Sequence, residues 1–183
     1  MDRGSDENFW VFAYGSLIWR PDFPFVEGVP GRLHGWHRRM CIRSIHYRGR
    51  PDRPGLVLGL DRGGSCRGLA YRVADDLVET VRRILDEREL ISGVYDPRYA
   101  PVTLDDGRRV AGYLFVARRG HDQYAGGLRT EETAAMIRQG HGSCGSSRDY
   151  LANTVRHLEI LGLGGASLRR LLQLVDEPVA VPS

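Results

Sequence analysis

Strand-like runs of apolar residues dominate the first half of the chain, and two more follow before the C-terminal third. The predicted strands are Trp10 to Tyr14, Gly31 to Ser44, Leu56 to Asp61, Cys66 to Val73, Tyr99 to Leu104 and Arg109 to Ala117. Asp105-Asp106-Gly107 separates the last two strands and predicts a hairpin turn.

Helical periodicity appears between the strand groups and again toward the C-terminus. A helix is predicted from about Asp75 to Leu90, with Asp75 or Asp76 available as its N-cap. Further helices are predicted over Glu131 to Gln139, Asp149 to Leu161 and Leu168 to Val175. Ser146 and Asp149 have the spacing of a capping box, and Gly162 follows the last turn of that helix. Strands grouped apart from a few helices predict an α+β fold whose sheet is curled or closed.

The first predicted helix directs one carboxylate inward. Val81, Leu85 and Glu89 are spaced four apart and therefore share the apolar face of this helix. A separate polar stripe is formed by Glu79, Arg83 and Glu87. Burial raises the pKa of a carboxylate toward that of a working base, so Glu89 is a candidate general base. The alternative is that the helix frays by Arg88, which leaves Glu89 on the surface or paired with an arginine.

A second candidate feature is the loop that ends the first strand. The apolar run Trp10 to Ala13 stops at Tyr14-Gly15-Ser16, which is a turn with little steric bulk. A glycine beside a serine lets backbone N–H groups approach a carboxylate or an oxyanion closely. The segment from Ala13 to Leu17 is therefore a candidate binding loop.

Composition restricts the class of protein. The chain has 183 residues, 42% of them hydrophobic, and a mean hydropathy of −0.34. These values predict one soluble domain over residues 1–183, with residues 1–8 as a flexible N-terminus. No apolar run approaches the roughly 20 residues that span a bilayer, and the first eight residues are too acidic for a signal peptide. We therefore expect a cytoplasmic protein that does not bind membranes.

All 26 basic residues are arginine, which excludes mechanisms that need a catalytic or phosphate-binding lysine. The net charge is only +3 and the arginines form short pairs, so no nucleic-acid partner is predicted.

The cysteine and histidine spacings predict neither disulfides nor a metal site. The three cysteines are Cys41, Cys66 and Cys144. They are widely separated, and reduced thiols are the default in the cytosol. His34 and His37 lie three residues apart, as do His141 and Cys144. Neither pair is matched by a second pair of metal-ligand residues at a suitable spacing. We expect no metal and no cofactor, and a spectator role for Cys144 rather than redox sensing.

Three segments of the chain are informative when taken together: Val11 to Trp19, Arg88-Glu89, and the glycine-rich stretch running into Asp149-Tyr150-Leu151. In this combination they resemble the ChaC-type γ-glutamylcyclotransferases that degrade glutathione. Further matching motifs are Trp19 to Phe23, Tyr47 to Gly49, Tyr95 to Arg98 and Gln123 to Gly126. The resemblance covers nearly the whole chain. Ala13 is a departure, because many members carry glycine at that position.

The resemblance implies a closed mixed β-barrel with helices packed outside, and a cofactor-independent lyase. The implied reaction converts glutathione to 5-oxoproline and cysteinylglycine. Glu89 would be the catalytic acid/base. The γ-glutamyl group would be held by the loop residues Ala13, Tyr14, Gly15, Ser16 and Leu17. Arg48, which could meet a substrate carboxylate, and Tyr150 at a helix start are further candidate substrate-binding residues.

Other functions stay open at this point. Ser16 could act as the nucleophile of a hydrolase, but Leu17-Ile18 stands where the Gly-x-Ser-x-Gly elbow needs glycine. The substrate could be another γ-glutamyl amine or γ-glutamyl amino acid. The chain could also be a non-catalytic regulator of cation transport on the same fold. The sequence does not predict an oligomeric state.

Overall fold

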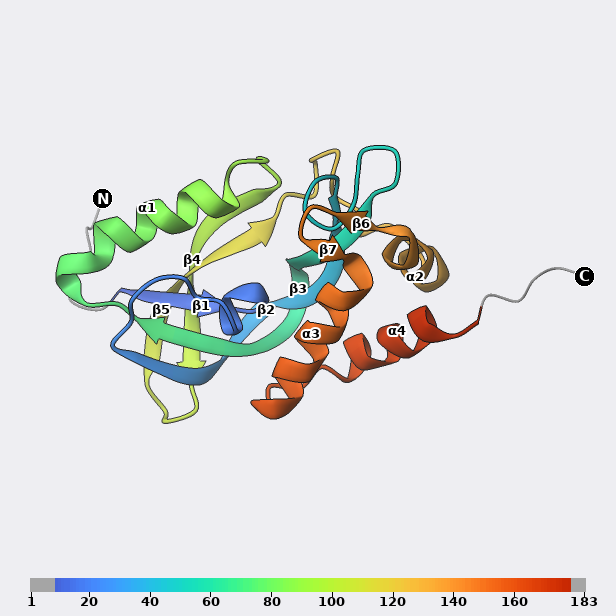
Figure 1. Cartoon of the computed structure of the whole chain (residues 1–183). Helices are drawn as coiled ribbons and strands as arrows, with labels where there is room; N and C mark the ends of the chain where they lie inside the picture. The colour runs from blue at the N-terminus through green and yellow to red at the C-terminus, as the bar shows by residue number, and fades with distance from the viewer. Residues whose placement is uncertain (1–8, 179–183) are drawn as a thin grey trace, which may run out of the picture. The chain divides into compact units, whose positions relative to one another are not determined.

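The computed structural model describes residues 9–178, and its five long strands form a closed barrel (Figure 1). The strands are β1 (Trp10–Ala13), β2 (Glu27–Ser44), β3 (Gly55–Arg72), β4 (Tyr95–Leu104) and β5 (Arg109–Ala117). Their order around the barrel is β1-β3-β2-β4-β5. Because β1 pairs antiparallel with β3 and parallel with β5, the barrel is mixed. The α+β class and the closed mixed barrel are thus confirmed, whereas the expectation for residues 1–8 lies outside the described residues.

Strand β3 is continuous where the sequence predicted two strands. Asp61-Arg62-Gly63-Gly64 resembles a turn, but the chain runs through it in one strand from Gly55 to Arg72. Gly63 and Gly64 have φ values of +98° and +68°, which a residue with a side chain rarely adopts. Glycine at these positions lets the strand bend without ending. The predicted break was therefore wrong.

The chain divides into two compact units. Among the described residues, the first comprises 9–39 and Leu58–Tyr124, and the second comprises Met40–Val57 and 125–178. Strands β2 and β3 contribute residues to both units. The prediction of one domain over residues 1–183 stays a prediction.

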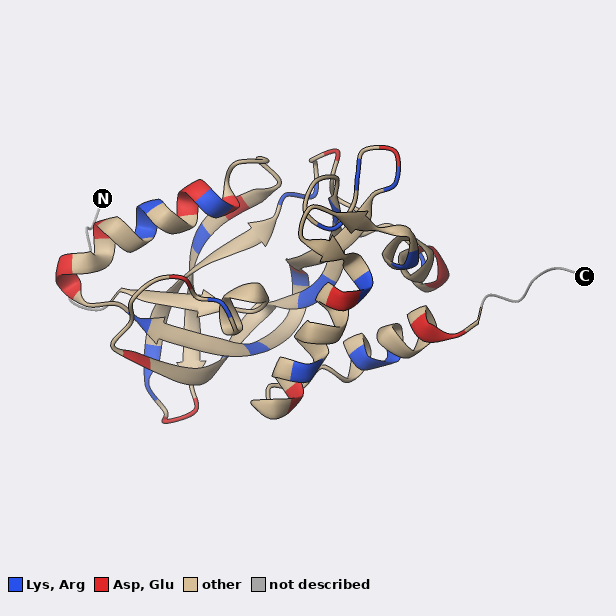
Figure 2. Ribbon diagram, viewed as in Figure 1, with Lys and Arg blue, Asp and Glu red and all other residues tan. Residues whose placement is uncertain are grey.

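Helix α1 (Val78–Glu89) belongs to the first unit and lies along the barrel strands (Figure 1). Its apolar face is buried, as predicted, through Val81 and Leu85. The hydroxyl of Tyr113 on β5 donates to Asp86 at 2.5 Å and fixes the helix on the barrel. The predicted polar stripe is exposed and alternates in charge (Figure 2). Its members are Glu79, Arg83 and Glu87.

The N-cap predicted for this helix was wrong. Asp75 and Asp76 lie inside a 3₁₀ turn, and α1 begins after Leu77 with no side-chain cap. The backbone starts the turn by itself, because the Leu77 N–H donates to the Ala74 carbonyl at 2.9 Å. The carboxylates of Asp75 and Asp76 instead lie in the first turn of this 3₁₀ segment, where the dipole of the peptide groups favours negative charge.

The core of the barrel is built from the inward-facing positions of all five strands. Its fully buried members include Trp10, Phe12, Leu33, Leu60, Val102 and Leu114. Burying each large apolar side chain stabilises the fold by about 1.5–3 kcal/mol. This core anchors β1, and β1 leads directly into the candidate loop.

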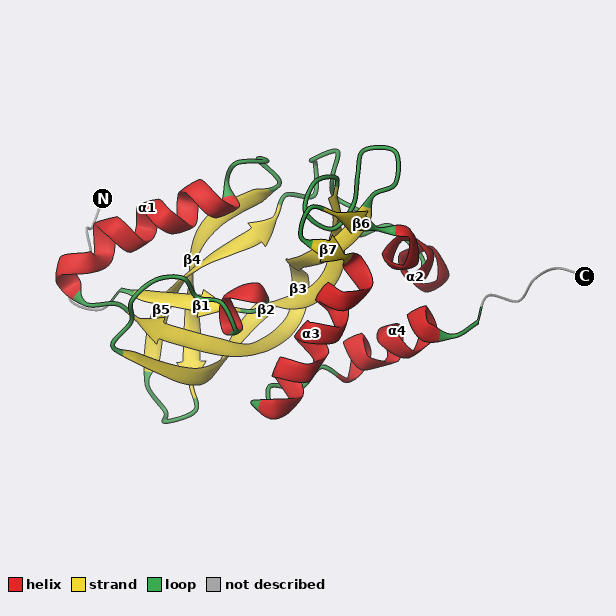
Figure 3. Ribbon diagram, in the orientation of Figure 1, coloured by secondary structure: helices red, strands yellow, loops and turns green. Residues whose placement is uncertain are grey.

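Three helices and a short hairpin make up most of the second unit (Figure 3). They are α2 (Thr130–Gln139), β6 (His141–Gly142), β7 (Gly145–Ser146), α3 (Ser147–Ile160) and α4 (Ala166–Asp176). The predicted cap of α3 is confirmed, because the Asp149 N–H donates to Ser146 Oγ at 2.9 Å. The β6–β7 hairpin was not predicted, because two-residue strands leave no period in a sequence.

Candidate functional site

The candidate loop folds into a 3₁₀ helix, Ser16–Ile18, immediately after β1. Its oxygen atoms are held by side chains of the barrel strands. Arg38 Nε donates to the Tyr14 carbonyl at 2.5 Å. The Tyr71 hydroxyl donates to the carbonyls of Ile18 at 3.0 Å and Leu17 at 3.3 Å. Burial raises the pKa of Tyr71 to about 12, so this hydroxyl stays protonated and remains a donor.

The N–H groups of the loop have a different environment from its oxygens. The Ile18 N–H donates to the Gly15 carbonyl at 2.9 Å and closes the turn. Within the part of the chain that the structure describes, the N–H groups of Gly15, Ser16 and Leu17 have no acceptor. Adjacent backbone N–H donors at the start of a turn are suited to bind a carboxylate or an oxyanion. The loop therefore presents donors in the arrangement that the sequence suggested.

Gly68 on β3 lets the start of the loop lie close to the barrel wall. A Cβ atom at Gly68 would lie 2.3 Å from the Ala13 carbonyl oxygen and 2.7 Å from Cζ of Phe12. Only glycine fits this contact without displacing β1. Sequence reasoning missed Gly68, because a glycine inside a strand does not reveal which backbone approaches it.

Glu89 is the last residue of α1, and its side chain is only 19% exposed. The helix does not fray before it, since the Leu90 N–H still donates to the Asp86 carbonyl at 2.9 Å. Burial raises the pKa of Glu89, and the positive charge of Arg88 partly opposes that rise. The prediction of an inward carboxylate agrees with this placement. The pairing named in the alternative also occurs, because Arg88 Nε lies 3.3 Å from Glu89 Oε1.

Arg88 also contacts the candidate loop. Its Nη2 donates to Ser16 Oγ at 2.9 Å, so Ser16 and Glu89 share one guanidinium group. The structure thereby brings together the loop and the carboxylate, which the sequence had identified separately. In the sequence, Arg88 stands out only as the neighbour of Glu89, and no local pattern indicates its contact with Ser16.

Arg48 and Tyr150 lie together in the second unit. The guanidinium carbon of Arg48 is 5.5 Å from the centre of the Tyr150 ring, which is buried. Nη1 of Arg48 donates to the Cys144 carbonyl at 2.5 Å and approaches the Ser146 carbonyl at 3.4 Å. Among residues 9–178, these side-chain hydrogen bonds of Arg48 all use Nη1. Its Nε and Nη2 groups make no hydrogen bond to the described residues.

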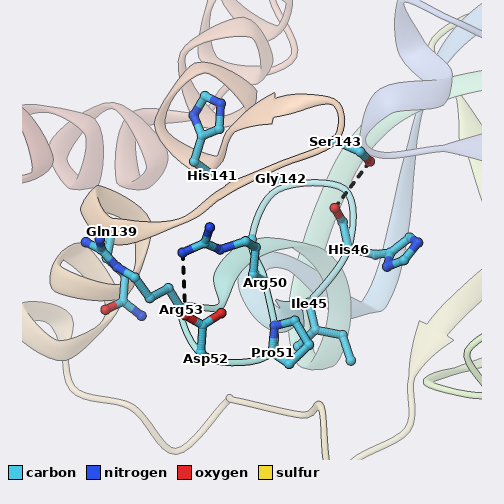
Figure 4. Close-up of a pocket in the computed structure, with 11 residues that line it drawn as sticks. Ile45, His46, Arg50, Pro51, Asp52, Arg53, Gln139, His141, Gly142 and Ser143 are labelled. Carbon is cyan, nitrogen blue, oxygen red and sulfur yellow. Dashed lines mark hydrogen bonds and ion pairs between the residues drawn. The ribbon is translucent and has the colours of Figure 1, made fainter.

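The second unit also contains a cavity of about 690 Å³ (Figure 4). Its polar lining residues include His46, Arg50, Asp52, Arg53, Gln139 and His141. Arg50 pairs with Asp52 at 3.4 Å, and Ser143 Oγ donates to the His46 carbonyl at 3.2 Å (Figure 4). The predicted site residues are not among those that line this cavity.

The remaining predictions concern cysteines, metals and membranes. All three cysteines are free; Cys41 and Cys66 are buried, and Cys144 is exposed. Over residues 9–178, no group of three or more His, Cys, Asp or Glu side chains is placed to hold a metal ion. None of the helices described is long and apolar enough to cross a membrane.

Comparison with protein families and curated proteins gives consistent matches along the chain. A family model described as ChaC-like protein matches residues 9–178. The glutathione-specific γ-glutamylcyclotransferase of Escherichia coli (strain K12) is 36% identical over 178 residues, which cover 97% of this chain and 77% of that protein. γ-Glutamylcyclotransferase 2-3 of Arabidopsis thaliana is 34% identical over 163 residues, covering 84% of this chain and 81% of the relative.

Solved structures support the fold independently. The crystal structure of a yeast γ-glutamyl cyclotransferase specific to glutathione superposes with a TM-score of 0.84 at 22% sequence identity. The match covers 93% of this chain and 96% of the yeast chain. At that identity, the likeness establishes a shared fold.

Proposed function

From the finding that this chain belongs to the ChaC-like family, we propose that it is a glutathione-specific γ-glutamylcyclotransferase. The reaction needs no external nucleophile. The α-amine of the γ-glutamyl group attacks its own γ-carbonyl carbon and closes the five-membered ring of 5-oxoproline. The bond from that carbon to the cysteine nitrogen breaks, and cysteinylglycine leaves. Intramolecular attack is favourable once the site holds the substrate in the bent conformation.

Glu89 is the acid/base of this reaction. It accepts a proton from the attacking amine and returns the proton to the departing peptide nitrogen. The observation that carries this assignment is the inward position of Glu89 at the end of α1, where burial raises the pKa of its carboxyl above the ordinary value. A carboxylate with the ordinary pKa would be a weaker base at the pH of the cell.

The loop from Ala13 to Leu17 binds the γ-glutamyl group. The N–H groups of Gly15, Ser16 and Leu17 are oriented by the bonds that hold the loop oxygens. They bind either the α-carboxylate of the substrate or the oxyanion that forms at the γ-carbonyl. Arg48 and Tyr150 are further substrate-binding residues in this proposal, and Arg48 supplies a positive charge for a substrate carboxylate.

The proposal requires no metal or cofactor and places the reaction in the cytoplasm, where the protein meets glutathione. Ser16 is not the nucleophile of a hydrolase in this scheme. Its Oγ accepts from Arg88, and a guanidinium cannot remove the hydroxyl proton. The substrate is therefore the source of the nucleophile.

Incubation of the purified protein with glutathione, without metal or nucleotide, tests the proposal. The products to quantify are 5-oxoproline and cysteinylglycine. Glu89→Gln keeps the shape of the side chain but cannot accept a proton. Glu87→Gln is the matched control, because Glu87 lies two residues away on the exposed face of α1. We expect product from the wild type and from Glu87→Gln, and none from Glu89→Gln.

The other outcomes separate the alternatives. Product from all three proteins would show that Glu89 is not the base. If glutathione gives no product but another γ-glutamyl amine or amino acid does, the chemistry stands and the substrate differs. If no γ-glutamyl compound is converted, the non-catalytic role in cation transport gains support.

A further inference from the structure

The guanidinium group of Arg88 contacts four groups from two parts of the first unit. Nε pairs with Glu89 Oε1 at 3.3 Å, and Nη2 donates to Ser16 Oγ at 2.9 Å. Nη1 donates to Asp22 Oδ2 at 3.2 Å and to the Arg20 carbonyl at 3.3 Å. A guanidinium is planar and rigid, so its three nitrogens fix the positions of their partners relative to one another.

Asp22 strengthens this arrangement. Among the described residues it is the only non-glycine residue with a positive φ, at +56°. Aspartate adopts this left-handed conformation more readily than most residues do. The turn directs the Asp22 carboxylate to Arg88, and the ion pair holds the segment that follows the loop.

From this geometry we infer that Arg88 is a positioning residue, which sets the Glu89 carboxylate and the binding loop in one fixed arrangement. The inference rests on the proposed function, because it assigns no chemistry to Arg88 itself. The contact between Arg88 and Ser16 joins residues 72 positions apart. Loss of this contact would let the loop and the base move independently.

The bond to Ser16 has a second effect. Arg88 donates to Ser16 Oγ, so the serine hydroxyl hydrogen is directed elsewhere. Within residues 9–178 that hydrogen has no acceptor. It therefore adds one donor to the N–H groups that the loop presents to the γ-glutamyl group.

The charge of Arg88 acts on Glu89 directly. Burial raises the pKa of Glu89, and Arg88 is the charged group that lowers it. The same guanidinium is also ion-paired to Asp22, whose Oδ2 lies 3.2 Å from Nη1 of Arg88. Arg88 thus has two separable contributions: its charge opposes the rise in the pKa of Glu89, and its geometry holds the loop.

Two substitutions separate these contributions. Arg88→Gln removes the charge and most of the hydrogen bonds, whereas Arg88→Lys keeps a point charge but cannot reach four partners. Arg83→Gln is the matched control, since Arg83 is exposed on the same helix. The kinetic constants kcat and KM for glutathione are measured from pH 4 to 9, together with the thermal midpoint of each protein.

For Arg88→Gln we expect kcat/KM to fall by about 100-fold, as for a small misplacement of reacting groups. The acid limb of its kcat/KM–pH profile should move upward by about one pH unit, because the Glu89 carboxylate has lost the opposite charge beside it. For Arg88→Lys we expect a several-fold higher KM with the acid limb near that of the wild type. Arg83→Gln should match the wild type in every measurement.

The inference is overturned if Arg88→Gln keeps the wild-type KM and acid limb. It is also overturned if activity falls only in proportion to the loss of folded protein. Should Arg88→Gln fail to fold, Arg88→Lys decides the question: a wild-type KM would refute a role in holding the loop. If the wild-type protein itself forms no 5-oxoproline, the proposed function fails, and the inference fails with it.

Discussion

The hydroxyl of Tyr124 lies 2.9 Å from Oδ2 of Asp61 and donates to a carboxylate that is only 2% exposed. Arg119 Nε donates to the other oxygen at 2.8 Å, and the Arg62 N–H reaches the same oxygen at 2.9 Å. Asp61 is thus a buried charge in the middle of β3 with its hydrogen bonds satisfied. This network compensates the charge where the sequence predicted that a strand would end.

We predict that Asp61→Asn destabilises the protein by about 2 kcal/mol, because the buried amide has one acceptor oxygen and cannot accept the hydrogen bonds of both Arg119 and Tyr124. Urea unfolding followed by circular dichroism measures this loss. Tyr124→Phe is the milder companion, with an expected cost of about 1 kcal/mol for one hydrogen bond. Equal stability of Asp61→Asn and the wild type would show that the network is not stabilising.

The same carboxylate predicts how stability depends on pH. Burial raises the pKa of Asp61, but the hydrogen bonds from Arg119 and Tyr124 together lower it by more. The pKa of Asp61 therefore lies below its ordinary value of 3.8. The unfolded chain therefore binds the proton at a higher pH than the folded protein. Asp61 contributes full stability above about pH 4, and this contribution is lost as the pH falls through the folded value. Unfolding from pH 7 to pH 2.5 should show a shallower acid loss in Asp61→Asn than in the wild type.

Glu89 titrates in the opposite sense. Because burial raises its pKa above the ordinary 4.5, it becomes protonated at a higher pH than an exposed glutamate. A base works only when ionised, so kcat/KM should fall on the acid side with a midpoint above pH 4.5. A pH series of 5-oxoproline formation measures this midpoint. An acid limb at or below 4.5 would show that Glu89 is not the titrating base.

Gly68→Ala tests the packing beneath the loop. The added methyl group would lie 2.3 Å from the Ala13 carbonyl oxygen, so β1 and the loop must shift. We expect a loss of stability of about 1–3 kcal/mol and a higher KM for glutathione. Gly120→Ala is a suitable control, because nothing lies within 4 Å of a Cβ at that position. Unchanged kinetics in Gly68→Ala would mean that the loop does not depend on this contact.

Local patterns predicted the parts of the fold that local forces determine. The β5 strand has the predicted bounds Arg109–Ala117, since its apolar run is buried and the hairpin turn before it is explicit. The α3 cap was predicted from the spacing of Ser146 and Asp149. The continuity of β3 was not, because Asp61 is compatible with a buried strand only when Arg119 and Tyr124 compensate its charge.

The candidate site was likewise predictable from the sequence only in part. The inward direction of Glu89 follows from its four-residue spacing with Leu85, which the helix maintains to its last residue. The contact between Arg88 and Ser16 depends on how the barrel places two distant segments, and no periodicity encodes it. The closed barrel itself was predicted from a family resemblance, because pairing between distant strands cannot be read from one apolar run.

The two-sided pairing of β1 determines when the candidate loop can become ordered during synthesis. Trp10 pairs with Arg72 on one side and with Gly112 on the other. The second partner leaves the ribosome about 100 residues after β1, and contacts so distant in sequence are slow to form. The strand that precedes the loop is therefore translated before both of its partners and is enclosed only after the second has emerged. A nascent chain that ends before β5 lacks the parallel neighbour of β1, so the candidate loop is supported on one side only until β5 has been translated.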